Sequence, residues 1–296
     1  MKVYKTDQVR NITLIGNAGS GKTTLAEAML FEGGVINRRG EVTAKNTVSD
    51  FTQIEQDYGN SVYPSILYTE FNGKKINIID APGMDDLCGG VVSSLHVTGL
   101  GLLTINTTSG VEAGTESAAR HAETAATPLV LVFNQLDHDN SNYESALEQC
   151  RNSFGNKVTV VQYPVDAGPG FSSIIDVLKM KMYKYGKDGG KPEVLDIPSS
   201  ETDKAEELHN QLIEMAAENE ESLMEMYFEQ GTLSEDEMRK GIRLGILDRS
   251  VIPVFCTCAK KNIGVGRLLE FLCNVAPAPN DKKMSPVIGG QPVKME

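Results

Sequence analysis

The feature that most constrains the fold is the loop GNAGSGKT near the start of the chain, which directly follows the apolar run at residues 11–15. This G-x-x-x-x-G-K-[ST] pattern, set between a buried strand and the first turn of a helix, binds phosphate groups. Its glycines let backbone N–H groups turn toward a polyphosphate, Lys22 reaches the terminal phosphates, and the Thr23 hydroxyl can bind Mg²⁺. The predicted contacts are Gly16, Asn17, Ala18, Gly19, Ser20, Gly21, Lys22, Thr23 and Thr24. The chain is therefore predicted to bind a nucleoside triphosphate.

Two later segments indicate which nucleotide is bound. The sequence from Asp80 to Gly83 (DAPG) follows the apolar run 76–79, and Asn134 to Asp137 (NQLD) follows the run 129–133. Both are thus expected at the carboxyl ends of strands, the edge of an open α/β sheet where ligands bind. Asp80 can hold a Mg²⁺-bound water, while the Gly83 amide can sense the third phosphate.

Asp137 predicts the choice of base. Its carboxylate matches the N1–H and exocyclic amine of guanine, and adenine has no such pair of donors on that edge. An unpaired buried carboxylate is costly, so the pocket should reject ATP. Each short pattern alone is weak, but their order and spacing together favour GTP or GDP.

Composition places the chain among globular proteins of a reducing compartment. It has 296 residues, 40% of them hydrophobic, and no signal peptide or membrane span is recognisable. Its cysteines are odd in number and sparse, which favours a reducing cytoplasm over a disulfide framework. They are Cys88, Cys150, Cys256, Cys258 and Cys273. We expect a cytoplasmic monomer without a membrane partner.

The net charge of −12 is concentrated in one segment. Residues 199–237 contain thirteen acidic residues and the single base Lys204, so the rest of the chain is neutral. Apolar residues recur at helical spacing from Ala205 to Met215, and Ser234 with Glu237 forms a capping box that begins a second helix. The acidic faces are either a solvated surface or a docking surface for a basic partner. Their sign disfavours binding of free nucleic acid by this domain.

The predicted architecture is α/β: a Ras-like P-loop domain with a mainly parallel sheet flanked by helices, and an inserted α-rich acidic subdomain. Strands are expected near 11–16, 65–71, 76–80, 101–106, 129–134 and 251–256, with helices starting at Lys22 and near Gly114, Tyr143 and Val265. We expect a nucleotide domain at 1–157 and 250–276 and the insertion at 158–249. Residues 277–296, rich in Pro and Gly, are expected to be a linker toward a missing second domain.

Over nearly its whole length the chain resembles the first domain of elongation factor G, the ribosomal translocase. The resemblance is carried by GNAGSGKTT from Gly16, TVSDFTQIEQDYGNSV from Thr47, DAPG, GVEAGTESAARHAE from Gly110, FNQLD, and PVFCTCAKKNIGVGRLL from Pro253. The insertion resembles the extra subdomain that this family carries inside its GTPase domain.

The resemblance implies the roles of individual residues. Asn134 and Asp137 would close the guanine pocket, and Cys258-Ala259, where the family has Ser-Ala, would lend a backbone amide to the guanine carbonyl. Thr23 would hold Mg²⁺ directly and Asp80 through water, with Ser61 joining in the triphosphate state. The switch segments would run from about residue 43 to 63 and from 80 to about 94. The acidic insertion would meet the ribosomal stalk near the factor-binding site.

Departures from the family pattern affect the predicted chemistry. Met84 occupies the position of the histidine that orients the attacking water, and a thioether can neither donate a hydrogen bond nor act as a base. No catalytic residue is therefore assigned beyond the phosphate clamp Lys22, and hydrolysis is expected to be slow. Gly19 replaces an aspartate of the family's phosphate loop, and Gln135 replaces a lysine, so affinity is expected to fall somewhat while guanine selectivity survives.

Three functions remain open at this stage. The first is a GTP- and Mg²⁺-binding switch, similar to elongation factor G, with weak or lost hydrolysis. The second is a fully active translational GTPase of the ribosomal-protection or release-factor type, in which another group replaces the histidine. The third is a metabolic P-loop kinase or ATPase, which would require an adenine pocket.

Overall fold

The computed structural model describes residues 2–187, 189–281, 287–288 and 291–292, and centres on a seven-stranded sheet of order β2-β3-β1-β4-β5-β11-β6. Every pairing in this sheet is parallel except that of β2 with β3. Its strands are β1 (Val9–Ile15), β2 (Ser65–Phe71), β3 (Lys74–Asp80), β4 (Leu100–Asn106), β5 (Leu129–Asn134), β6 (Val158–Val160) and β11 (Ile252–Cys256). The predicted α/β fold with a mainly parallel sheet is confirmed.

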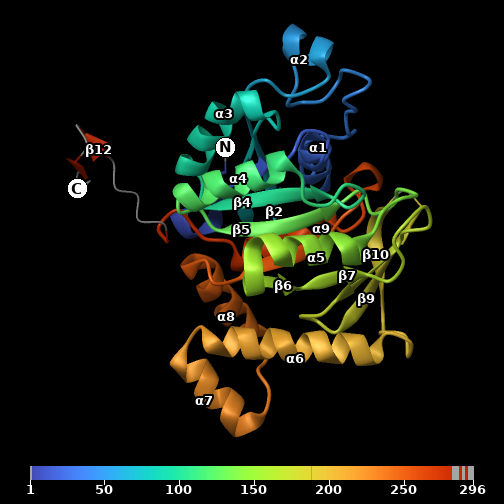
Figure 1. Cartoon of the computed structure of the whole chain (residues 1–296), viewed down its shortest axis with the longest axis vertical. Helices are drawn as coiled ribbons and strands as arrows, with labels where there is room; N and C mark the ends of the chain where they lie inside the picture. Colours follow the sequence, from blue (N-terminus) through green and yellow to red (C-terminus); the bar gives the residue numbers. More distant parts are fainter. Residues whose placement is uncertain (1, 188, 282–286, 289–290, 293–296) are drawn as a thin grey trace.

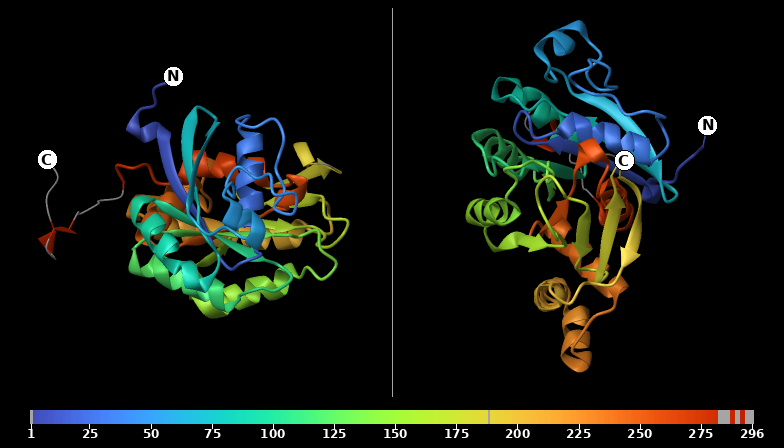
Figure 2. Two further views of the ribbon diagram at one scale, coloured as in Figure 1. Left: turned by 90° about the horizontal axis from the view of Figure 1, so that it is seen from above. Right: turned by 90° about the vertical axis from the view of Figure 1, so that its right-hand side faces the viewer.

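Helices cover both faces of this sheet. In the side view of Figure 2, α1 and α9 lie on one face and α3, α4 and α5 on the other. These helices are α1 (Lys22–Glu32), α3 (Cys88–Val97), α4 (Ala113–Thr124), α5 (Tyr143–Phe154) and α9 (Val265–Val275). Because both faces are covered, β5 and β11 are buried at every position and read as continuous apolar runs.

The strand order reverses at β1, which pairs with β3 on one side and β4 on the other. The crevice at such a reversal, beyond the carboxyl ends of the strands, is where open α/β sheets bind ligands. The loop after β1, the ends of β3 and β5, and the loop after β11 all meet at this edge. Short α2 (Gln53–Tyr58) lies above it at one end of the molecule (Figure 1).

The insertion contains both a sheet and helices. Its four-stranded antiparallel sheet has the order β10-β9-β8-β7. Its elements are β7 (Gln162–Pro164), β8 (Ser173–Asp176), β9 (Lys181–Gly186), β10 (Gly189–Leu195), α6 (Thr202–Glu218), α7 (Glu221–Gln230) and α8 (Glu235–Asp248). The helices were expected from the sequence, but this sheet and strand β6, which extends the main sheet beyond β11, were not.

Local sequence signals explain the helices of the insertion. Ser234 caps α8, and its hydroxyl and the Glu237 carboxylate form the predicted reciprocal capping box. Helix α6 buries Ala205 and Leu212 along one stripe and leaves its acidic side chains to solvent. In Figure 1, α6 and α7 lie at the opposite end of the molecule from α2.

A buried ionic contact attaches the insertion to the main domain. Arg267 of α9 donates to Asp176 of β8 over 2.7 Å, and their side chains are only 11% and 2% exposed. The same guanidinium stacks on the ring of Tyr183, and Glu270 of α9 binds Lys179. These charge-assisted contacts are directional and shielded from water. They therefore fix how β8 and β9 are oriented against α9.

The remaining elements are short. The 3₁₀ turns are η1 (Thr6–Gln8), η2 (Asp85–Leu87), η3 (Gly155–Lys157) and η4 (Ala259–Lys261), and β12 (Val287–Ile288) pairs with β13 (Gln291–Pro292). The predicted linker at 277–296 lies in large part outside the described residues. Within the described part of the chain, no helix is both long and apolar enough to cross a membrane.

Candidate functional site

The phosphate-binding loop is preorganised by its glycines and by Lys22. Gly21 is the N-cap of α1 with φ +90°, and a Cβ atom there would lie 2.4 Å from Nδ2 of Asn134. The Lys22 ammonium folds back and donates to the carbonyls of Gly16 (3.0 Å) and Asn17 (2.9 Å). Burial lowers the pKa of Lys22 to about 8, with the charges of Asp80 and Asp50 opposing that change. A desolvated cation at a helix N-terminus is a strong site for an anion.

Oxygen donors gather beside this cation. Thr23 Oγ1 donates to Asp80 Oδ2 over 2.8 Å and lies 3.1 Å from the hydroxyl of Ser61. Asp80 is fully buried, and burial raises its pKa to about 6 although the Thr23 hydrogen bond opposes that rise. Its second oxygen, Oδ1, has no hydrogen-bond partner among the described residues. The three predicted metal-binding residues are thus brought together.

Asp50 is a fourth oxygen donor at this place, and sequence reasoning assigned it no role. It is 5% exposed, its Oδ1 also lacks a hydrogen-bond partner among the residues described, and burial raises its pKa while hydrogen bonding with Ser61 opposes the rise. The orphaned oxygens of Asp50 and Asp80, with the hydroxyls of Thr23 and Ser61, form the hard donor set that Mg²⁺ prefers. The residues therefore fit the expected ion. The signal that could have found Asp50 is its place within the quoted segment from Thr47.

Gly83 lies against the phosphate-binding loop. A Cβ atom at Gly83 would meet Lys22 Nζ at 2.2 Å and the amide nitrogen of Ala18 at 2.9 Å, so only glycine fits this approach. A cavity of about 230 Å³ lies between the two loops. It is lined by Ala18, Gly19, Gly21, Lys22, Thr23, Thr24, Val42, Asp50, Gly59, Asn60, Ser61, Gly83 and Gln135. The predicted switch residues therefore border the same space as the phosphate loop.

Asn134 joins three loops by its side-chain amide. Its Nδ2 donates to the carbonyl of Ser20 over 3.1 Å, and its Oδ1 accepts from the backbone N–H of Ala259 over 3.0 Å. Gln135, with φ +62°, donates from Nε2 to the carbonyl of Gly19 over 2.7 Å. These bonds hold the phosphate loop and the loop after β11 beside each other at the end of β5.

Asp137 lies at the far end of this arrangement from Lys22. Burial opposes ionisation of Asp137, but hydrogen bonds from Cys258 and Lys261 outweigh it and lower the pKa. The Lys261 ammonium is 3.0 Å from Oδ2 of Asp137. Burial and the carboxylate raise the pKa of the Cys258 thiol to about 12, so the thiol stays protonated and donates. The carboxylate is thus held ionised and oriented by these two partners.

No histidine approaches the phosphate site in the described residues. His96 lies on α3 and bonds the carbonyl of Val92 in its own helix, and His121 lies on α4. Met84, directly after Gly83, is half-buried at the start of η2. The side chain that follows Gly83 is therefore a thioether and not an imidazole.

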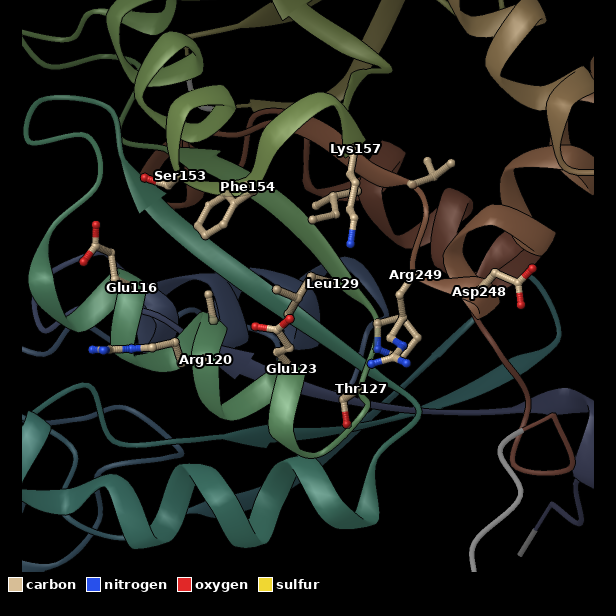
Figure 3. A pocket seen from close by; sticks show the side chains of 14 residues that line it. Glu116, Arg120, Glu123, Thr127, Leu129, Ser153, Phe154, Lys157, Asp248 and Arg249 are labelled. Atoms are coloured by element: carbon tan, nitrogen blue, oxygen red, sulfur yellow. The ribbon is translucent and has the colours of Figure 1, made fainter.

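A larger hollow of about 540 Å³ lies at the opposite edge of the sheet, at the amino ends of β5, β6 and β11 (Figure 3). Glu123, Lys157 and Arg249 surround it, together with Phe154 and Leu129. None of the predicted nucleotide-binding residues lines it. The chemistry predicted from the sequence therefore belongs to the smaller cavity.

Comparisons with known proteins agree with this geometry. The model of the family described as elongation factor Tu GTP binding domain matches residues 7–278. A crystal structure of a protein from Thermus thermophilus is similar to this chain with a TM-score of 0.88 and 28% sequence identity. The similarity covers 95% of this chain and 42% of that one, so this chain spans less than half the length of that protein.

Proposed function

Because the chain belongs to the family of elongation factor Tu GTP-binding domains, as a translational GTPase domain of the elongation factor G type, we propose that it is a GTP- and Mg²⁺-dependent switch that acts on the ribosome and hydrolyses GTP slowly. The proposal depends mainly on the two side-chain hydrogen bonds of Asn134. They join the loops at Ser20 and Ala259, between the Lys22 ammonium and the Asp137 carboxylate. The Lys22 end of this site would bind phosphates, and the Asp137 end would bind guanine.

The base end derives its selectivity from an oriented charge. Asp137 would accept from N1–H and the exocyclic amine of guanine, displacing or sharing its contacts with Lys261 and Cys258. The backbone N–H of Ala259 would serve the guanine carbonyl. ATP would leave the carboxylate unsatisfied, which disfavours the kinase or ATPase alternative.

The phosphate end would hold Mg²⁺ through Thr23, Ser61 and Asp80, with Asp50 as an added outer carboxylate. The ion, when bound, neutralises charge on the terminal phosphates. Lys22 would leave its two carbonyl acceptors for phosphate oxygens, and the Gly83 amide would meet the third phosphate. Loss of that phosphate would release Ser61 and Gly83, which is the switching event.

Slow hydrolysis follows from Met84. Its thioether can neither position nor deprotonate an attacking water, and no histidine lines the cavity beside Gly83 in the described part of the chain. Binding and clamping by Lys22 would remain, so the protein would stay long in its GTP state. Help from the ribosome would be the route to the fully active alternative.

The proposal is tested by calorimetric titration of the protein with GTP, GDP and ATP in the presence of Mg²⁺, followed by GTP turnover with and without ribosomes. We expect binding of both guanine nucleotides, no measurable binding of ATP, and slow turnover. Equal affinity for ATP and GTP would refute the guanine pocket. Rapid turnover without ribosomes would refute the proposed loss of water positioning.

The affinity for Mg²⁺ and GDP should depend on pH in a bell-shaped manner. Ligand binding needs a charged Asp80, whose pKa burial raises to about 6, and a charged Lys22, whose pKa burial lowers to about 8. Affinity should therefore be highest near neutral pH and fall by up to about tenfold per pH unit as Asp80 takes up a proton or Lys22 loses one. Titrations from about pH 5 to 9 measure it, and a flat profile would contradict it.

The acidic face of α6 is the proposed docking surface for the ribosomal stalk. Glu206, Glu207, Glu214 and Glu218 are all exposed on this helix. Reversal of Glu206 and Glu218 to lysine should slow association with ribosomes by up to about tenfold at low salt and less at high salt, since steering by charge is screened. Stopped-flow association rates measure this effect.

The matched control reverses two exposed acids on other helices, Glu116 on α4 and Glu148 on α5, which gives the same change in net charge. Association should then stay near the wild-type rate. Equal slowing by both pairs would mean that only net charge matters, and the face of α6 would then serve solubility.

A further inference from the structure

Arg39, which lies just before the first switch segment, connects the chain there to the loop after β11. Its Nη1 donates to the backbone carbonyls of both Ala259 (2.9 Å) and Lys260 (2.7 Å), about 220 residues away along the chain. The guanidinium also lies over the ring of Phe31 on α1, 5.6 Å from its centroid. No ion pair between Arg39 and a carboxylate is found within the described residues, so its hydrogen-bond acceptors there are these two carbonyls.

The loop that Arg39 holds is the one proposed to recognise guanine. Ala259, which accepts from Arg39 through its carbonyl, donates from its N–H to Asn134. Lys261, the next residue after the second carbonyl, is the ion partner of Asp137. The two peptide groups that Arg39 fixes are therefore flanked on both sides by contacts of the base pocket.

The switch segment is anchored on its other side to α1. The N–H groups of Gly40 and Val48 donate to the two carboxylate oxygens of Glu27 over 2.7 and 2.5 Å. Glu27 is only 1% exposed, so its carboxylate is shielded from water and these two N–H groups satisfy both of its oxygens. Asp50 follows two residues after Val48, and its carboxylate lies beside the hydroxyl of Ser61. The chain between Arg39 and Asp50 therefore spans from the base loop to the proposed metal site.

We propose that Arg39 is a positioning residue that couples occupancy of the guanine pocket to closure of residues 40–48 against Glu27, at the start of the first switch segment. Guanine would order the loop at Ala259 and Lys260, the ordered carbonyls would hold Arg39, and Arg39 would keep Gly40 and Val48 on Glu27. By linkage, the closed segment raises affinity for the base by the same factor. This inference rests on the proposed function, because it requires a guanine nucleotide in the site.

The test uses the whole chain with Arg39→Ala and with Arg39→Met, which keeps a stem over Phe31 but removes the donors. Its control is Arg38→Ala, because Arg38 is exposed and its replacement removes an equal charge from the same segment. The first readout is hydrogen exchange of the Gly40 and Val48 amides with and without GDP. GDP is chosen because it lacks the third phosphate that the switches are proposed to sense.

We expect GDP to slow exchange of both amides in the wild type and in Arg38→Ala, and to change it little in either Arg39 variant. Dissociation of fluorescent GDP, the second readout, should be about fivefold faster in the Arg39 variants. Equal GDP-induced protection in Arg39→Met and the wild type would overturn the inference. If the wild type binds no GDP, the proposed function itself fails. If the wild type binds GDP but the Gly40 and Val48 amides gain no protection, only the coupling through Arg39 fails.

Discussion

Replacement of Asp137 by asparagine is expected to lower the affinity for GDP by about a thousandfold. The carboxylate would accept two hydrogen bonds from guanine, and bonds to a charged group contribute about 1.5–3 kcal/mol each. An amide can accept from N1–H but places its own N–H₂ against the exocyclic amine of guanine. The same amide matches the carbonyl of xanthine, so the variant should bind xanthosine diphosphate better than the wild type does.

Competition of GDP and xanthosine diphosphate against a fluorescent nucleotide measures both effects. The control is Asp139→Asn, which removes the same charge from an exposed site two residues away. Lys261 loses its partner in Asp137→Asn, but its side chain is 35% exposed and can be hydrated. If the variant kept the purine preference of the wild type, Asp137 would not select the base.

Conversion of Met84 to histidine is expected to raise the rate of GTP hydrolysis by about a hundredfold or more. A positioned acid or base contributes about 10²–10⁴ in rate, and an imidazole at this position could orient the attacking water. The clamp of Lys22 and the oxygen donors around Thr23 are already in place. The substitution would therefore supply the one function that the thioether lacks.

Single-turnover hydrolysis, measured with and without ribosomes, provides the test. In the control Asp85→His the imidazole stands one residue further along, at an exposed position, and the rate should not rise. If Met84→His hydrolyses GTP at the same rate as the wild type, another group positions the attacking water. A gain in Asp85→His of the same size would indicate a general effect of imidazole rather than its placement.

The sequence predicted those parts of the fold and site that depend on local chemistry. The helix starts at Lys22 and Tyr143 agree with the structure, as does the capping box at Ser234, because glycine turns, periodicity and capping act over a few residues. Strands β4, β5 and β11 were predictable since buried parallel strands are continuous apolar runs, whereas the three-residue β6 was not expected. The roles assigned to the nucleotide-site residues stay predictions, although the structure brings these residues together.

Features that depend on distant contacts were not predictable in the same way. Strands β7 and β8 have three and four residues, too few for a periodic pattern. The contact of Arg39 with Ala259 joins positions separated by 220 residues, and no spacing rule reports it. The burial of Asp50 likewise depends on how the switch segment folds back over α1. In each case tertiary packing supplies the information.

The surroundings of the Cys258 thiol could not be predicted from the sequence. Cys256 ends β11 and Cys258 lies in the loop after it, and both are buried. The proximity of the Cys258 thiol to Asp137 became visible only once the loop after β11 was placed beside β5. Because burial and that carboxylate raise its pKa to about 12, this thiol resists deprotonation despite its place in a binding pocket.

Strands β6 and β11 are parallel neighbours, with Ile252 opposite Val158, so the chain leaves β6 at one edge of the sheet and must return to the opposite edge to begin β11. Adjacent parallel strands elsewhere are joined by a connection of about a dozen residues, usually one helix. The insertion is therefore an enlarged crossover whose length the sheet does not dictate. The crossover is nevertheless built into the fold, because Tyr163, Ile174 and Ile175 of the insertion share one continuous buried cluster with Phe255 and Phe271 of the main domain.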